Sequence, residues 1–442
     1  MMKPLKRGIR LPDFKYRSLS STQIHLPSPP QFVTLMLNQH AGARVKACFG
    51  KGDPVFVGTK IADGEDWVSV PLHSSVSGYI SEVTPSAIII ESDETDRFDP
   101  QIHASSEIPS NPARLVEIIR EAGIVDLGGS AAPTHVRLVE ARTRGVQTLV
   151  LNGCESEPFL TADHMLMLNR PVEILKGAEL LRIACGANRA TIAVERNKLE
   201  VVEILNSKNY NLKIETVGTH TLPVRYPQGT ERMLTEAVIG RKLRLDESPI
   251  QAGVLVENVA TAFAVYEAVY LKKPLYERVV TVAGPCVVEP KNLWARIGTH
   301  ATDLIRSAKG FMRHPDRVVF GGPMTGEAIR DLETPVTKKV QGILALPADL
   351  VAPGQEEPCI RCGWCVDVCP ELLVPETLVR AVQKRDDKLA KEFNIDSCTE
   401  CGACTYICPS KIPMGVIIQK GKTESIGASF PPEPAYAFSP RG

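Results

Sequence analysis

The chain has 442 residues, which at roughly 100–200 residues per domain predicts two to four domains. Hydrophobic residues make up 43% and charged residues 23%, a composition that excludes a collagen, a disordered protein and a small disulfide scaffold. The 51 Lys and Arg are balanced by 51 Asp and Glu, and this neutrality argues against a nucleic-acid partner. Cysteine is the outlier, because eight of the 12 fall between Cys359 and Cys408.

The amino-terminal sequence carries neither a secretory signal nor a membrane span. Its basic stretch has no apolar core behind it, and no run approaches the roughly 18–20 apolar residues that cross a bilayer. We therefore expect the chain to stay in the cytosol, where clustered thiols hold metal more often than they form disulfides. Docking onto a membrane protein is compatible with this expectation.

The first hundred residues predict an irregular lead-in followed by a β module. Residues 1–34 are rich in Pro and Ser. Residues 35–105 contain short β-type runs such as PVFVGTKI and SAIIIES, separated by Gly/Asp turns. This spacing of short runs is typical of a small all-β domain.

Residues 106–275 predict an α/β domain with a mainly parallel sheet. The pattern begins with a helix at 111–121, where apolar residues recur at helical spacing. Apolar runs then alternate with helical segments, which is the pattern of βαβ units. The predicted strands are 148–152, 191–195 and 213–217, and the predicted helices are 171–184 and 198–206.

The rest of the chain predicts a compact α+β module and a cysteine-bearing helical segment. Residues 276–347 return to short strands around a helix at 302–308. Residues 348–421 open with a linker at 348–357 and continue as a helical, cysteine-bearing segment. Residues 422–442 are rich in Pro and Ser and are predicted to be an extended tail.

Two copies of one cysteine motif dominate this last segment. Both read C-x2-C-x2-C-x3-C-P, the bacterial run for a [4Fe–4S] cluster, in which the fourth cysteine ligates the other cluster. Paired CxxC motifs also bind zinc, which is the alternative, but the duplicated spacing matches the cluster rule at every position. One predicted ligand set is Cys359, Cys362, Cys365 and Cys408; the other is Cys369, Cys398, Cys401 and Cys404.

Two loops of the α/β domain are candidates for a ligand site. The small-residue turn around Gly128 and Gly129 precedes a helix and suits a phosphate, although any such turn reads similarly. The second loop carries Asn152, Glu155 and Glu157 directly after the strand 148–152, at the end where α/β sheets place ligands. A solvated loop face is the alternative for these acids.

Together these stretches resemble the C subunit of the Rnf electron transport complex, which is related to the flavin- and NADH-binding subunit of respiratory complex I. The loop 152–158 fits the family's NxxExEP motif, YPQG at 226–229 fits a second segment, and ENVAT at 257–261 resembles its NVxT segment. The resemblance covers about residues 35–420. It implies a barrel-sandwich module at 35–105, a Rossmann-like flavin domain at 106–275, a β-grasp module at 276–347 and a helical ferredoxin domain at 348–421.

The resemblance also implies the activity and the partners. NADH would pass a hydride to FMN, and two [4Fe–4S] clusters would carry electrons toward the membrane subunits of the complex and, indirectly, ferredoxin. The protein would sit peripherally on the cytoplasmic face of the membrane and take part in ion translocation. The residues implied in flavin binding are Gly128, Gly129, Arg137, Asn152, Glu155, Glu157, Gly229, Glu231 and Asn258, with Arg137 facing a phosphate.

The flavin loop departs from the family's GxGGAGFPT pattern. Asp126 replaces its first Gly, and Ser130, Ala131 and Ala132 replace AGF, which removes an aromatic ring that would stack on the nucleotide. Two other functions therefore stay open. One is a cobalamin reductase of the kind associated with bacterial microcompartments, and the other is a flavin-less iron–sulfur relay or scaffold.

Several single residues have two interpretations. Cys154 is a reactive thiol or, more simply, a buried packing residue, and the same packing role is expected for Cys48, Cys185 and Cys286. His135 and His164 flank the proposed site, where a hydrogen-bonded structural role is the simpler interpretation. Trp364 shields the first cluster from solvent or only packs there.

Overall fold

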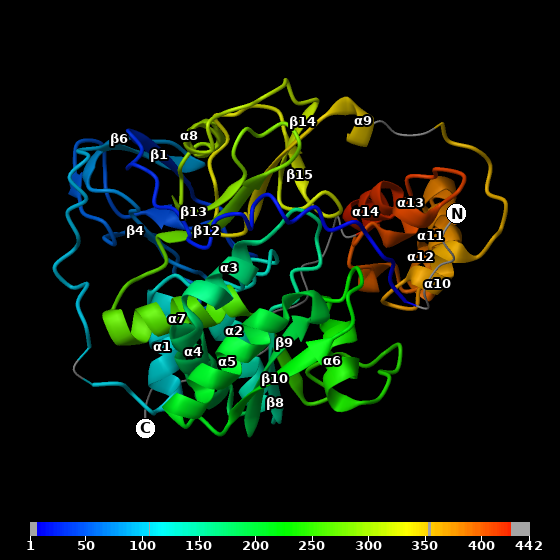
Figure 1. The fold of residues 1–442 in the computed structure, drawn as a ribbon, viewed down its shortest axis with the longest axis horizontal. Helices are drawn as coiled ribbons and strands as arrows, with labels where there is room; N and C mark the ends of the chain where they lie inside the picture. Colours follow the sequence, from blue (N-terminus) through cyan, green and yellow to red (C-terminus); the bar gives the residue numbers. More distant parts are fainter. Residues whose placement is uncertain (1–6, 106, 352–354, 426–442) are drawn as a thin grey trace. The chain divides into compact units, whose positions relative to one another are not determined.

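A computed structural model describes residues 7–105, 107–351 and 355–425 (Figure 1). The chain forms two compact units. The larger is Arg10–Ala352, and the smaller combines Met1–Ile9 with Pro353–Gly442. Among the described residues, no helix is both long and apolar enough to cross a membrane.

The larger unit begins with two small antiparallel sheets. The first has the order β1-β7-β6-β3, and the second has the order β2-β4-β5. Strand β1 starts at Phe32, so the expected irregular lead-in 1–34 ends early; Phe32 pairs with Glu91, and Val33 and Leu35 alternate into the core. The strands are β1 Phe32–Met36, β2 Lys46–Ala47, β3 Pro54–Val55, β4 Lys60–Asp63, β5 Leu72–His73, β6 Gly78–Val83 and β7 Ala87–Ser92.

A four-stranded parallel sheet follows, with the order β10-β9-β8-β11. Its strands are β8 Thr148–Asn152, β9 Arg189–Glu195, β10 Val217–Leu222 and β11 Val254–Asn258. The helices of this region are α1 Pro112–Glu121, α2 Thr134–Thr143, α3 Ala162–Asn169, α4 Pro171–Cys185, α5 Leu199–Leu212, α6 Glu231–Ile239 and α7 Val259–Leu271, with a 3-10 turn, η1, at Arg196–Lys198.

Both faces of this sheet are covered, which explains why its strands read as continuous apolar runs. Leu149 and Leu151 of β8 join the core that also contains Leu175 of α4. Val150, between them in sequence, packs with Leu234 of α6 on the opposite face. Figure 1 shows α4 and α5 on one side of the sheet and α6 on the other.

The strand predicted at 213–217 is wrong. Helix α5 continues to Leu212 and ends where Lys213 adopts a left-handed conformation, with φ of 55°. The strand β10 begins only at Val217 and ends at Leu222. The apolar residues Ile214 and Val217 pack around this turn, so their pattern resembled a strand.

The third part of the larger unit is a five-stranded mixed sheet with the order β13-β12-β16-β14-β15 and its own apolar core. The predicted helix near 302–308 is α8, Ala301–Ser307. Part of the predicted linker 348–357 is helical, because α9 spans Ala348–Val351; residues 352–354 lie outside the described residues. The strands are β12 Glu277–Ala283, β13 Lys291–Arg296, β14 Arg317–Phe320, β15 Glu327–Ile329 and β16 Gly342–Leu346.

The smaller unit is helical around a compact core that includes Leu378, Ile395 and Ile418. Its helices are α10 Trp364–Val368, α11 Pro375–Lys384, α12 Asp387–Glu392, α13 Ala403–Ile407 and α14 Met414–Ser425, with a 3-10 turn, η2, at Ile395–Ser397. The tail predicted to be extended from 422 is helical through 425, and its remainder, 426–442, lies outside the described residues. Close packing explains the extension, since a Cβ at Gly421 would lie 2.2 Å from Val382.

Candidate functional site

At the carboxyl edge of the parallel sheet the strand order reverses between β8 and β11, which is where a ligand crevice is expected. From β8 the chain builds outward to β9 and β10 on one side, whereas β11 is added on the other. Such a reversal of strand order is where open α/β sheets bind ligands. Asn152 and Asn258 are paired in register as the last residues of β8 and β11, so both lie at this point.

The two asparagines are fixed by short hydrogen bonds. The Asn258 carboxamide oxygen accepts the Ala260 amide at 2.7 Å and so caps α7, while its nitrogen donates to Asp163 at 2.8 Å. Asn152 donates to the Gly229 carbonyl at 3.1 Å. A Cβ at Gly229 would lie 3.0 Å from the Asn152 side chain, so a larger residue would crowd this approach.

The glycine turn lies beside Asn258 and is open to solvent. A Cβ at Gly128 would lie 3.3 Å from Asn258, and Gly129 has φ of 109° with open space where a side chain would be. Two of the four departures from the family pattern bond to each other, because the Ser130 hydroxyl donates to Asp126 at 2.6 Å. Asp126 also accepts the Gly128 amide at 3.3 Å, a hydrogen bond that fixes the conformation of the turn.

Arg137 turns toward protein carboxylates in the folded chain. Its guanidinium donates to Glu231 at 2.6 Å and to the Val256 carbonyl at 2.7 Å, and lies 3.4 Å from Glu257. Burial raises the pKa of Glu257 to about 8, against the opposing effect of Arg137. The guanidinium therefore ties α6 to the end of β11 through these contacts.

Glu155 and Glu157 point to different places. The Glu155 carboxylate accepts the amides of Asp163 at 2.8 Å and His164 at 3.3 Å, so it caps the first turn of α3. Glu157 reaches the turn before β15, where it accepts the Met324 amide at 3.1 Å and the Thr325 amide at 3.0 Å and hydroxyl at 2.6 Å. Both carboxylates accept hydrogen bonds from backbone amides. A solvated loop face, the alternative for these acids, would not require such bonds.

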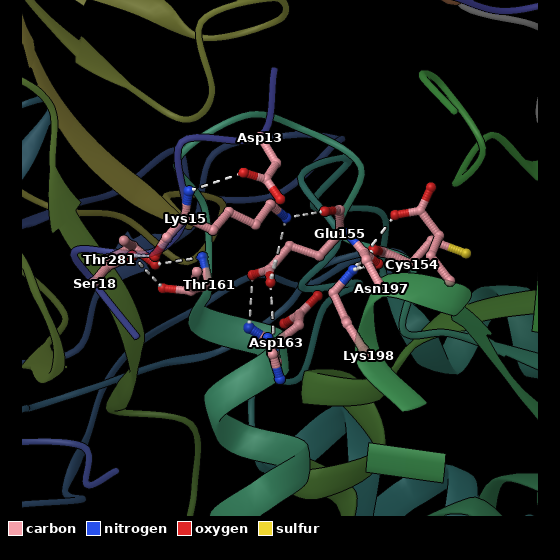
Figure 2. Close-up of polar contacts among 12 residues, drawn as sticks. Asp13, Lys15, Ser18, Cys154, Glu155, Thr161, Asp163, Asn197, Lys198 and Thr281 are labelled. Carbon is pink, nitrogen blue, oxygen red and sulfur yellow. Dashed lines mark hydrogen bonds and ion pairs between the residues drawn. The ribbon is translucent and has the colours of Figure 1, made fainter. Parts of the chain in front are cut away.

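Lys15 contacts the loop that carries the NxxExEP motif, a contact that the sequence reasoning missed. Its side chain is 6% exposed, and its ammonium donates to the Glu155 carbonyl and lies 4.0 Å from the Glu155 carboxylate (Figure 2). Nothing in the Pro- and Ser-rich pattern of the first 34 residues singles it out. A cavity of about 370 Å³ lies here, lined by loops that follow β8, β9 and β10 and by residues 10–15.

A second buried cation, Lys198, lies next to this cavity. It donates to the Cys154 carbonyl at 2.5 Å and lies 3.4 Å from Glu195. Burial raises the pKa of Asp163 to about 7, and the neighbouring Glu155 charge acts in the same direction. The loop 154–163 is therefore surrounded by ionisable groups that the fold holds away from water.

Most of the remaining singled-out cysteines and histidines have the structural role that was the simpler interpretation. Cys154, Cys185 and Cys286 are buried, and burial raises the pKa of the Cys154 thiol, which makes it inert. Cys48 is exposed, contrary to expectation, because Ala47 and Phe49 on either side take the core-facing positions. The histidines are hydrogen-bonded: His135 contacts the Trp67 carbonyl at 2.7 Å, and His164 contacts Glu200 at 2.7 Å.

The eight cysteines of the smaller unit line two separate cavities. Trp364 lines the first, together with Ile360 and Met414. The grouping follows the ligand sets expected from the spacing. Cys359, Cys362, Cys365 and Cys408 line the first cavity, and Cys369, Cys398, Cys401 and Cys404 line the second.

The two cysteine loops have the same local backbone. Arg361 and Glu400 each have a left-handed φ, of 55° and 56°, and each donates its amide at 3.4 Å to the sulfur two residues earlier. Gly363 and Gly402 then adopt φ of 77° and 72°. Among the described residues, no three His, Cys, Asp or Glu side chains are arranged to hold a single metal ion. Each cavity instead gathers four cysteines, the number of thiolates that hold one [4Fe–4S] cluster, so the donor set fits two clusters.

The strand ends and the glycine turn carry features that suit a flavin nucleotide. The glycine turn leaves backbone accessible beside Asn258, and the side-chain oxygen of Gln228, in the YPQG segment, is buried without a hydrogen-bond partner. Among the described residues, this oxygen is left open to an ordered water, an ion or a donor from a bound group. The structure thus gathers Gly128, Gly129, Asn152, Gly229 and Asn258 into one place.

Three family models match the chain. The Nuo51 FMN-binding domain matches residues 119–267, the RnfC barrel sandwich hybrid domain matches residues 3–97, and the 4Fe-4S dicluster domain matches residues 354–409. The chain therefore combines a flavin domain of the FMN-binding type with a domain for two iron–sulfur clusters, and FMN and [4Fe–4S] clusters are its cofactors.

Several relatives resemble the chain over most of its length. The C subunit of the proton-translocating ferredoxin:NAD(+) oxidoreductase complex of Clostridium ljungdahlii is 35% identical over 402 residues, covering 89% of this chain and 87% of that protein. Its Na(+)-translocating counterpart from Acetobacterium woodii is 35% identical over 390 residues, covering 86% and 87%. The C subunit of the ion-translocating oxidoreductase complex of Serratia proteamaculans is 34% identical, covering 88% of this chain and 56% of that protein.

A solved structure shares the fold. A chain of the NAD+-reducing [NiFe]-hydrogenase in the H2-reduced state has a TM-score of 0.51 and 16% identity, covering 72% of this chain and 62% of that chain. At this identity the likeness concerns the fold alone. The relatives, by contrast, are more than 30% identical over most of the chain. Because of this identity, the chain belongs to the family of C subunits of ion-translocating oxidoreductase complexes of the Rnf type.

Proposed function

We propose that this protein is the peripheral redox subunit of a membrane-bound, ion-translocating complex that exchanges electrons between NAD(H) and ferredoxin. The observation that carries the proposal is one chain with both a strand-order reversal at the carboxyl edge of its parallel sheet and two four-cysteine cavities. The relatives named for ferredoxin:NAD(+) oxidoreductase activity support the same function.

The finer architecture is part of the proposal. The module at 35–105 is a barrel-sandwich domain, 106–275 a Rossmann-like FMN domain, 276–347 a β-grasp module and 348–421 a helical ferredoxin domain. The parallel sheet, the separate core of the five-stranded sheet and the helical core around Ile395 support these divisions. The segments 1–34 and 422–442 flank them.

Each part of the crevice has a proposed task. Bound FMN supplies two-electron exchange with NAD(H) and one-electron exchange with iron–sulfur clusters. The turn at Gly128 and Gly129 lets backbone amides approach its phosphate, since a helix follows directly. Asn152 and Asn258 orient the nucleotide from the strand ends. Arg137, through Glu231, keeps the wall of the crevice in place.

The eight cysteine thiolates hold the two clusters, with Cys369 and Cys408 each crossing to the set of the other motif. Trp364 and its apolar neighbours limit solvent access to the first cavity. Electrons leave toward the membrane subunits of the complex on its cytoplasmic face, and ferredoxin is reached indirectly. The protein itself binds the cofactors and relays electrons, while ion movement belongs to the membrane partners.

Anaerobic purification followed by titration with NADH tests this function. We expect bound FMN, iron for two clusters, and bleaching of the flavin absorbance on adding NADH. Retained FMN that NADH fails to reduce would contradict the proposal, because electrons could not enter at the crevice.

A flavin-less relay is the second candidate, and one observation favours it. Asp126 and Ser130 bond to each other across the glycine turn, which places a carboxylate where the family has glycine. Ala132 also lacks the ring that would stack on a nucleotide. Iron for two clusters without any FMN, even after incubation with excess FMN, would support this candidate.

A further inference from the structure

A segment far away in sequence crosses the edge of the flavin domain. The Asp13 carbonyl accepts the Phe159 amide at 2.8 Å, and the Phe14 ring stacks on Phe159 with centroids 4.8 Å apart. Further along, the hydroxyls of Ser18 and Thr161 lie 3.0 Å apart. The segment is therefore fixed on both sides of Lys15, on the loop that carries the NxxExEP motif.

This anchoring brings the Lys15 ammonium to the protein interior beside Glu155 (Figure 2). An ammonium has three hydrogens to donate. The Glu155 carbonyl accepts one of them, and the Glu155 carboxylate is 4.0 Å away. The cavity that Lys15 borders also touches Ser156 and Tyr226, which come from the two loops carrying the family's motifs.

The charge of Lys15 is compensated by the Glu155 carboxylate at 4.0 Å and, from farther away, by Glu195 and Asp13. The Glu155 carboxylate is already held by two amides of α3, and Glu195 lies close to Lys198 instead. Burial, followed by the Lys198 charge, lowers the pKa of Lys15 to about 8. Desolvating a cation costs free energy even beside a carboxylate, and perturbed ionisable groups that border a cavity concentrate at functional sites.

We propose that Lys15 is a positioning residue for the redox step: its positive charge stabilises the reduced, more negative form of the bound flavin and so raises the flavin's reduction potential. The inference deepens the proposed function and rests on it. A protein tunes a flavin through charges placed near its ring. Lys15 lies near the proposed flavin site because Glu155, its neighbour, accepts the Asp163 amide, and Asp163 in turn accepts a hydrogen bond from Asn258. The segment that carries Lys15 is therefore part of the redox site.

The test replaces Lys15 in the full-length protein and measures the flavin potential by spectroelectrochemistry. Lys15→Met keeps the length and apolar stem of the side chain but removes the charge, whereas Lys15→Arg keeps the charge. We expect Lys15→Met to lower the equilibrium ratio of reduced to oxidised flavin about tenfold. For a two-electron couple this makes the reduction potential about 30 mV more negative. Lys15→Arg should stay within a third of that shift.

The matched control is Lys46→Met. Lys46 lies in β2 with its side chain 81% exposed, so its loss should leave the flavin potential unchanged. Circular dichroism and thermal melting verify that each variant is folded. The flavin content is measured before and after incubation with excess FMN, so that partial loss of cofactor does not obscure the potential.

The outcomes separate this inference from the proposed function. Wild-type protein that binds no FMN refutes the proposed function itself. A wild-type protein with FMN and a Lys15→Met variant with the same potential refutes the role of Lys15 alone. A folded Lys15→Met variant that takes up no flavin also refutes it, since Lys15 would then be needed for binding rather than for the potential. A Lys15→Arg variant that shifts as far as Lys15→Met refutes it as well, because charge would not be the cause.

Discussion

Glu157 connects the flavin-domain loop to the turn before β15, and its replacement by Gln is the sharpest test of the site's architecture. One carboxylate accepts three hydrogen bonds from Met324 and Thr325, at 2.6 to 3.1 Å. Gln has the same shape, but one of its two terminal atoms becomes a donor. That donor would face amide or hydroxyl hydrogens that need an acceptor.

The expected loss follows from these bonds. Hydrogen bonds to a charged group contribute about 1.5–3 kcal/mol each, and a buried donor left without a partner costs a similar amount. With one carboxamide oxygen still able to accept, Glu157→Gln should weaken the turn by about 2–4 kcal/mol. Because every 1.4 kcal/mol is tenfold, the turn should open roughly 30- to 1,000-fold more often.

Hydrogen exchange of the Met324 and Thr325 amides measures this opening directly, since these amides make the bonds in question. Glu327→Gln is the control, because Glu327 lies in the adjacent strand β15 with its side chain 78% exposed. The control should leave both amides protected. Equal exchange rates in Glu157→Gln and the wild type would refute the assignment of Glu157 as the connection between the two loops.

Three further predictions concern the clusters, the pH dependence and the flavin. One electron paramagnetic resonance signal should disappear in both Cys362→Ala and Cys408→Ala, and the other signal should disappear in Cys369→Ala. If Cys408→Ala instead lost the same signal as Cys369→Ala, the crossed ligation would be contradicted. Burial lowers the pKa of Lys338 to about 7, so the unfolded chain binds more protons than the folded chain between pH 7 and about 10.5, and the stability of the fold rises with pH in this window. Lys338→Met should flatten this rise when the melting temperature is measured against pH. An unchanged slope would contradict the prediction. Ala132→Phe should tighten FMN binding about fivefold in a fluorescence titration by supplying a stacking ring, and unchanged affinity would show that the turn does not border the flavin.

Much of the fold could be predicted from local patterns. The strand at 148–152 was predicted with its observed bounds, because four residues that are buried in succession end at a polar Asn152. The helix predicted at 111–121 is α1, whose start is set by the Asn111 side chain capping the amides of Ala113 and Arg114. The cysteine spacing predicted two groups of four, and the structure gathers the same groups in two cavities, although the ligand assignment itself stays a prediction.

What could not be predicted depends on contacts between distant segments. Lys15 reaches Glu155 across 140 positions of sequence, and Glu157 reaches Thr325 across 168. No local periodicity encodes such pairs. Arg137 was expected to face a phosphate, and its actual partners, Glu231 and Glu257, come from separate elements that only the folded sheet brings together.

The central claim is that one chain joins a flavin site to two iron–sulfur clusters. Anaerobic purification with quantification of iron and FMN tests it most directly, followed by one spectrum before and one after NADH. The account predicts roughly eight iron atoms and one FMN per chain, with flavin bleaching followed by cluster reduction. Iron for two clusters with no FMN and no change on adding NADH would contradict it.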